Sequence, residues 1–223
     1  MKSKVRIVVI DSGIDSNSLD CVKESISLDF DEDNRIIESL DDKVNNEHGT
    51  IISLIINSVF KEIELISIKI LDENLLSNID LLIYSLEKAL SYNPDIIHMS
   101  LGTKKWRYKY KLRKLINNIL NRNIVVVSAV SNDGKTSYPA YFKNVIGVKQ
   151  KTDREKRPIY YMKNFYYAKG EVSKSVYKNA NKYLVGNSFA AAYITGYVAK
   201  VLYYKNFKNI DQINKYLKGK LKF

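Results

Sequence analysis

Short apolar runs of strand length alternate along this chain with longer segments of helical periodicity, and this alternation restricts the possible folds most strongly. Strands are expected at 4–10, 63–70, 95–99, 124–130 and 144–148, and helices after His48, from 79 to 90 following Ser77 as N-cap, and at 106–122, 188–204 and 209–218. Strands that alternate with helices pair in parallel, and the connecting helices lie on the sheet. The sequence therefore predicts an α/β fold with a mostly parallel central sheet and helices on both faces.

The length fits one domain with a sizeable core. The chain has 223 residues, 45% of them apolar, without a repeat or linker, so residues 1–223 are expected to form a single domain. The single cysteine, Cys21, cannot close an intrachain disulfide, and the first residues lack the apolar run of a secretory signal. We therefore expect a cytoplasmic protein without a signal peptide or pro-segment. No apolar run approaches the ~20 residues that span a bilayer, which excludes an integral membrane protein.

Charge is divided unevenly along the chain. Residues 1–103 contain 9 basic and 19 acidic side chains, a net charge of −10, whereas residues 104–223 contain 27 and 5, a net charge of +22. A positive face of this size can bind nucleic acid, anionic lipid or an acidic peptide, but it can equally be a solvated lysine-rich surface. Charge alone leaves the partner open.

Three polar positions stand where predicted strands end or helices begin. Asp11 ends the first strand, His48 begins an apolar helix, and Ser188 begins a helix rich in alanine. Each residue has another explanation when taken alone. The aspartate can bind a metal or a phosphate or cap a helix, the histidine can be a core or capping residue, and the serine can be an N-cap. Together they follow the order Asp, His, Ser of one known catalytic triad, in which the base activates the hydroxyl and the acid orients the base.

The residues around these positions resemble the subtilisin-like serine proteases (subtilases, peptidase S8 family). The matching segments are VRIVVIDSGID from residue 5, HGT from residue 48, IHMSLG from 97, VVVSAVSNDG from 125 and GNSFAA from 186. The resemblance implies a three-layer sandwich and a serine endopeptidase with Asp11, His48 and Ser188 as triad. It also implies that Asn132 stabilises the oxyanion.

The same resemblance implies where substrate binds. The peptide would lie extended along residues 100–102, and its residue before the cut would enter a pocket with Asp133 at the mouth, although Asp133 can equally be an ordinary turn residue. The implied substrate-binding residues are Ser100, Leu101, Gly102, Ala129, Val130, Ser131, Asp133 and Ser137.

Departures from the family pattern limit what carries over. Asn187 replaces the usual Thr and Ala192 the usual Pro, while the stretch after His48 is too short for the loop that commonly binds calcium. The acidic run 29–34 lacks the glycine and glutamate of an EF-hand, so we interpret it as a solvated loop. We expect no metal and no cofactor.

The small size of the chain and the expected cytoplasmic location favour selective processing of a peptide precursor, such as leader removal by small intracellular subtilases of lanthipeptide-type pathways. Leaders of that kind are often acidic, and the basic half would attract one. Two alternatives stay open: a catalytically silent binding module, and a basic nucleic-acid-binding protein, which is disfavoured because no reading motif is present. The sequence does not predict an oligomeric state.

Overall fold

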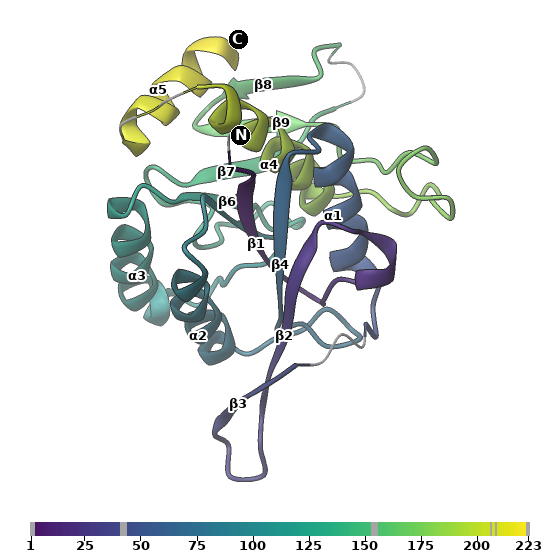
Figure 1. The fold of residues 1–223 in the computed structure, drawn as a ribbon. Coiled ribbons are helices and arrows are strands. Elements are labelled where there is room, and N and C mark those ends of the chain that lie inside the picture. The colour runs from purple at the N-terminus through teal and green to yellow at the C-terminus, as the bar shows by residue number, and fades with distance from the viewer. Residues whose placement is uncertain (1–2, 41–43, 153–155, 206, 208, 222–223) are drawn as a thin grey trace.

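One mixed sheet forms the centre of the molecule (Figure 1). The structure is a computed structural model and describes residues 3–40, 44–152, 156–205, 207 and 209–221. Within these residues the strand order is β3-β2-β4-β1-β5-β6-β7-β9-β8, and all neighbours are parallel except the edge pairs β2/β3 and β8/β9. The strands are β1 Val5–Asp11, β2 Val22–Phe30, β3 Ile36–Ser39, β4 Ile63–Lys69, β5 Ile96–Met99, β6 Val125–Ala129, β7 Ile146–Gln150, β8 Ile159–Met162 and β9 Phe165–Ala168.

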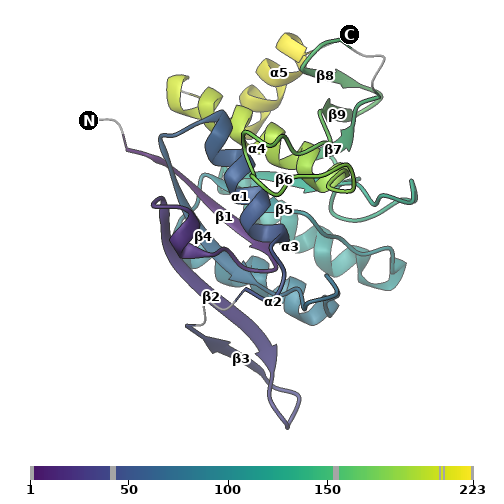
Figure 2. The ribbon, with the colours of Figure 1, turned by 90° about the vertical axis from the view of Figure 1, so that its right-hand side faces the viewer.

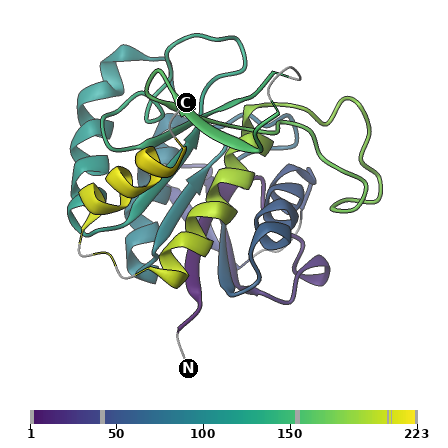
Figure 3. The same cartoon turned by 90° about the horizontal axis from the view of Figure 1, so that it is seen from above.

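Helices cover both faces of this sheet, as predicted. In Figure 2, α1 and α4 lie in front of the strands and α2 and α3 lie behind them. The view from above in Figure 3 shows the same three layers. The helices are α1 His48–Val59, α2 Ile79–Ala89, α3 Lys109–Asn121, α4 Asn187–Tyr204 and α5 Ile210–Leu221, with short 3-10 turns at Ser16–Ser18, Leu90–Tyr92 and Trp106–Tyr108. None of the helices in these ranges is long and apolar enough to cross a membrane.

The burial pattern explains the composition of the central elements. Apart from Arg6 and the final Asp11, strand β1 is apolar because it is covered on both faces, and its residues 7–10 are at most 1% exposed. Helix α1 is apolar on nearly all sides because it packs between the sheet and α4. A Cβ on Gly196 would lie 2.6 Å from Val59 Cβ, so glycine allows α4 to approach α1 this closely.

The structure differs from the sequence prediction in four places. Strands β8 and β9 lie in the segment 149–183, where no defined strand was predicted. Residues 22–39 form the β2–β3 hairpin, which was not predicted, and the expected acidic loop 29–34 is partly the end of β2. Its turn is closed by Asp31, whose carboxylate accepts the backbone N–H groups of Asp33 and Arg35. Helix α2 is capped by Asn78 rather than Ser77, because the Asn78 side chain accepts the backbone N–H of Asp80. Helix α3 begins at 109, after the 3-10 turn.

The parallel strands β1, β5 and β6 end together. Their pairing sets Ile10 level with Met99, and Met99 level with Ser128. The chain therefore leaves the sheet at one edge in three neighbouring places: at Asp11, after β5 and after β6. Ligand sites of open α/β sheets form at this edge.

Candidate active site

A buried carboxylate and an imidazole form the centre of this edge. Asp11 is 1% exposed, and its Oδ1 accepts a hydrogen bond from His48 Nδ1 at 2.8 Å and one from the Ser12 N–H at 2.7 Å. Burial raises the pKa of Asp11, but the charge and hydrogen bond of His48, with Ser100 and Ser12, lower it by more. Burial lowers the pKa of His48, but Asp11 raises it by more, so the net shift is upward from 6.5.

The turn after β1 fixes the position of His48. Ser12 Oγ donates to the Asn46 carbonyl at 2.8 Å and accepts the Gly49 N–H at 3.0 Å. A Cβ on Gly49 would lie 2.3 Å from the Gly13 carbonyl oxygen, so only glycine fits between α1 and this turn. The glycine of the HGT segment therefore allows the close approach that places His48 on Asp11.

Ser188 lies in the first turn of α4, at the same edge. Its hydroxyl donates to the Ser100 carbonyl at 3.4 Å, and in the described residues it makes no hydrogen bond to His48. The ring of the next residue, Phe189, packs on the His48 ring at a centroid distance of 5.4 Å. Ser188 thus lies beside Ser100, while Phe189 packs against His48.

Asn132 and Asn187 hold the start of α4 to the end of β6. The Asn132 side-chain oxygen accepts the Asn187 N–H at 3.1 Å, which leaves the Asn132 amide nitrogen without a partner among the described residues. The buried Asn187 side chain donates to the Val130 carbonyl at 2.9 Å and accepts the Gln150 N–H at 2.8 Å. Sequence reasoning treated Asn187 only as a replacement for Thr, because nothing in the sequence shows that it ties three segments together.

Residues 100–102 leave β5 as an irregular segment beside Ser188. The segment ends at Thr103, which pairs with Tyr138 in an isolated antiparallel bridge. A Cβ on Gly102 would lie 2.6 Å from the Tyr138 carbonyl oxygen, so glycine allows this approach. Of this segment, Ser100 contacts the Ser188 hydroxyl through its carbonyl, and substrate binding by Ser100, Leu101 and Gly102 stays a prediction.

The segment after β6 forms the other side. The buried Ser137 Oγ accepts the Ser131 N–H at 3.1 Å and so closes the loop from 131 to 137. Ala129 and Val130 are buried at the strand end. Asp133 is exposed, and its carboxylate accepts from Lys104 Nζ at 2.6 Å and from Ser131 Oγ at 2.7 Å, which lowers the pKa of Asp133. This pairing with Lys104 was not predicted, because the two residues are far apart in the sequence.

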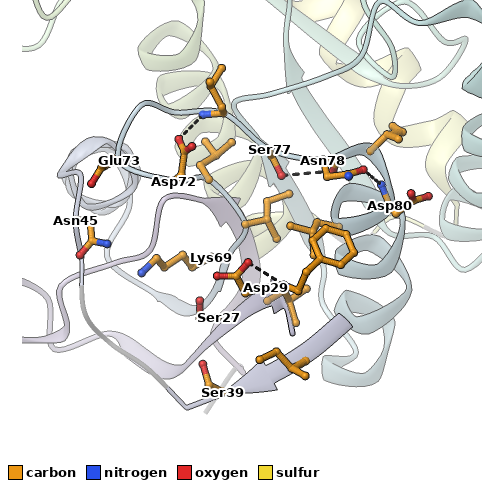
Figure 4. Close-up of a pocket in the computed structure, with 18 of the residues that line it drawn as sticks. Ser27, Asp29, Ser39, Asn45, Lys69, Asp72, Glu73, Ser77, Asn78 and Asp80 are labelled. Carbon is orange, nitrogen blue, oxygen red and sulfur yellow. Dashed lines mark hydrogen bonds between the residues drawn. The ribbon is translucent and has the colours of Figure 1, made fainter. Parts of the chain in front are cut away.

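Two grooves meet at Asn45, and His48 lines one of them. A groove of about 600 Å³ has His48 and Phe189 in its wall. A second one, of about 890 Å³, runs between the β2–β3 hairpin, the segment after β4 and residues 105–108, and side chains of both charges, such as Asp29, Lys69 and Asp72, line it (Figure 4). Asn45 lines both grooves, so a polypeptide at His48 has room to continue away from it.

These contacts define an α/β protein with a buried Asp–His pair and a serine at a helix start, all at the carboxyl edge of one sheet. The sequence profile of the subtilase family matches residues 2–219, so the chain belongs to the subtilase family.

Relatives of known name agree with this assignment. Over 162 residues the chain is 29% identical to subtilisin amylosacchariticus of Bacillus subtilis subsp. amylosacchariticus, a match that covers 66% of this chain and 40% of the relative. It is also 29% identical to a thermostable alkaline protease of Halalkalibacterium halodurans, over 70% of this chain and 47% of that protein. The chain thus spans less than half the length of these relatives.

A solved structure shares the fold. The crystal structure of a cold adapted subtilisin-like serine proteinase superposes with a TM-score of 0.74 at 18% identity, covering 97% of this chain and 82% of that one. This likeness confirms the predicted subtilisin-like architecture.

Proposed function

We propose that this chain is a serine endopeptidase whose nucleophile is Ser188. The observation that carries the proposal is the buried Asp11 bonded to His48 Nδ1, with Ser188 held at the same sheet edge. Since Nδ1 donates to Asp11, the neutral ring keeps Nε2 as its free base. Family membership supports the same reaction.

In the proposed reaction His48 Nε2 accepts the proton of Ser188 as its oxygen attacks the peptide carbonyl, and later gives that proton to the leaving amine. Asp11 stabilises the imidazolium that forms in between. The Ser188 hydroxyl, which donates to the Ser100 carbonyl at 3.4 Å, has to turn toward His48 when substrate binds. Such contacts commonly tighten only in the substrate complex.

The negative oxygen of the intermediate would be stabilised by two donors. One is the Asn132 amide nitrogen, whose orientation is set because the Asn187 N–H occupies the amide oxygen. The other is the backbone N–H of Ser188 in the first turn of α4, where helix N–H groups have no partner within the helix. Both donors are fixed before substrate arrives, so they require little reorganisation.

The peptide substrate is proposed to lie along Ser100, Leu101 and Gly102, with the residue before the cut directed to the loop 129–137. Pairing with an exposed segment gives affinity through the main chain and leaves selectivity to side-chain pockets. Asp133 at this loop is already paired with Lys104, so its proposed preference for basic residues is weaker than its charge alone implies.

A matched pair of variants tests the activity. Ser188→Ala should abolish cleavage of a mixed library of fluorogenic peptides, while Ser58→Ala, on α1 away from the site, should leave it intact. Both variants should remain folded, because among the described residues the Ser188 hydroxyl makes one long hydrogen bond and no helix cap, and Ser58 is exposed near the end of α1. Cleavage by Ser188→Ala at the wild-type rate would refute the assignment.

We further propose that the substrate is a peptide precursor with an acidic leader, processed inside the cell. Support comes from residues 104–114, which follow the substrate segment and contain seven cationic and no acidic side chains. Trp106 and Tyr110 within this basic segment are 83% and 81% exposed. Acidic side chains and aromatic contacts of a leader would complement this surface.

Charge reversal tests this finer proposal. Lys105→Glu, Lys111→Glu and Lys114→Glu together should raise KM several-fold for a peptide with an acidic leader at low salt, and leave a neutral leader unaffected. The matched control reverses the exposed Lys200, Lys215 and Lys220 on α4 and α5. Equal effects of the two triple variants, or equal effects on both leaders, would contradict a binding role for the basic segment.

A further inference from the structure

The second histidine of the chain, His98, is buried inside the sheet next to the proposed active site. It is 0% exposed on β5, with Nδ1 2.8 Å from Thr195 Oγ1 of α4 and Nε2 3.2 Å from Ser100 Oγ. Burial lowers its pKa to about 4, while the nearby Asp11 raises it and His48 lowers it. The ring is therefore neutral at physiological pH, with one nitrogen donating and the other accepting.

Asp11 has one oxygen without a donor. Its Oδ1 accepts from His48 and from the Ser12 N–H, whereas Oδ2 is buried and has no hydrogen-bond partner among the described residues. Ser100 is the remaining side chain that lowers the pKa of this carboxyl. A buried, charged oxygen without a donor is costly, so the direction of the Ser100 hydroxyl matters.

The positions of the heavy atoms allow two arrangements of the protons. In the first, Thr195 donates to the Ala191 carbonyl at 2.9 Å, His98 Nδ1–H donates to Thr195, and Ser100 donates to His98 Nε2. In the second, every donor is reversed: Thr195 donates to His98 Nδ1, and Nε2–H donates to Ser100. The Ser100 proton is then free to point at Asp11 Oδ2.

The second arrangement leaves fewer groups unsatisfied. The Ala191 carbonyl loses only an extra bond, because residue 195 of the same helix also supplies its backbone N–H four positions on. The gain is a donor for an ionised, buried oxygen, and hydrogen bonds to charged groups are the stronger ones. The proton balance therefore favours the arrangement in which all donors point toward the carboxylate.

We propose that His98 is a positioning residue that, with Thr195 behind it, turns the Ser100 hydroxyl toward Asp11 Oδ2. This inference rests on the proposed function, since Asp11 is the acid of that triad. Ser100 then contacts two members of the triad. Its hydroxyl donates to Asp11, and its carbonyl accepts the Ser188 hydroxyl. His98 itself touches neither substrate nor Ser188 and acts only through Ser100.

The tautomer of His98 tests the proposal without any assay of activity. The chain has two histidines, so ¹⁵N-histidine labelling gives only two ring spin systems, and the variant His98→Gln identifies which belongs to His98. We expect His98 at pH 7 to carry its proton on Nε2, with Nδ1 unprotonated. A proton on Nδ1 would overturn the proposal, whether or not the chain proves to be a peptidase.

Two substitutions test the consequence for catalysis. His98→Phe removes the donor to Ser100, so the Ser100 hydroxyl no longer donates to Asp11. The charge of Asp11 then acts more strongly on His48, and the pKa of His48 rises. The acidic limb of the kcat/KM profile should move to higher pH, and kcat should fall about tenfold or more with KM nearly unchanged. His98→Gln keeps an amide donor near the Nε2 position and should restore most of kcat and most of the wild-type pH profile.

The outcomes separate positioning from packing. Equal losses in His98→Phe and His98→Gln, with an unshifted pH profile, would show a structural role and overturn the proposal. If neither variant folds, as judged by thermal unfolding, His48→Ala assigns the two ring spin systems instead, and the tautomer of the wild-type protein decides. An inactive wild-type protein would instead refute the proposed function, and the NMR result would still stand.

Discussion

Replacing Lys104 by methionine should reveal a preference of Asp133 for basic substrate residues, which the Lys104–Asp133 ion pair suppresses in the native protein. Lys104 Nζ lies 2.6 Å from Asp133 Oδ2, so a basic residue before the cut has to compete with an internal cation. The Lys104 and Asp133 side chains are 49% and 39% exposed, and an ion pair this accessible to solvent contributes only weakly. Removing the competitor should therefore favour Lys over Glu at that substrate position by up to about fivefold in kcat/KM.

The assay compares peptides that differ only in the residue before the cut. The ratio of kcat/KM for Lys and Glu should be near one for the wild type and should rise in Lys104→Met at low salt, then fall as salt is added. Adding Asp133→Asn should cancel the rise. Lys109→Met is a matched control, because Lys109 lies over the Tyr138 ring instead of Asp133. An unchanged ratio in Lys104→Met at low salt would show that Asp133 does not face the substrate.

Three further results are expected. Asn132→Ala should lower kcat by about 10²–10³ with KM little changed, because its amide donates only to the oxyanion; a loss confined to KM would contradict this. The pKa of His48 is raised from 6.5 and the base must be neutral, so kcat/KM should decline as pH falls through a midpoint above 6.5; a midpoint well below 6.5 would mean that Asp11 does not act on His48. EDTA should leave cleavage unchanged, since no group of three or more acidic, His or Cys residues in the described ranges could hold a metal; loss of activity restored by calcium would refute this.

The sheet and its helices were predictable because their burial leaves a mark on the sequence. Strand β1 is apolar except at Arg6 and Asp11 since both its faces are covered, and α1 and α4 are apolar on nearly all sides since they lie against the sheet and each other. The β2–β3 hairpin was not predicted. Strand β3 at the sheet edge has no buried residue, and in β2 the buried Ile26 and Leu28 stand among polar residues, so no apolar run marks either strand.

Asp11 and His48 were predictable from their place in the chain, and the structure joins them. The supporting contacts were not. Asn187, Lys104 and His98 each act through a partner far away in the sequence, at Gln150, Asp133 and Thr195 respectively. Such pairs depend on how β5, β6, β7 and α4 meet in space, and the local pattern around each residue does not contain that information.

Covalent labelling of Ser188 tests the proposed nucleophile most directly. A fluorophosphonate reacts with a serine that a neighbouring base activates, and peptide mass spectrometry identifies the modified residue. We predict one adduct, on the peptide that contains Ser188, lost in Ser188→Ala and strongly slowed in His48→Ala. A folded wild-type protein that stays unlabelled, or one labelled elsewhere while Ser188 remains free, would contradict the account.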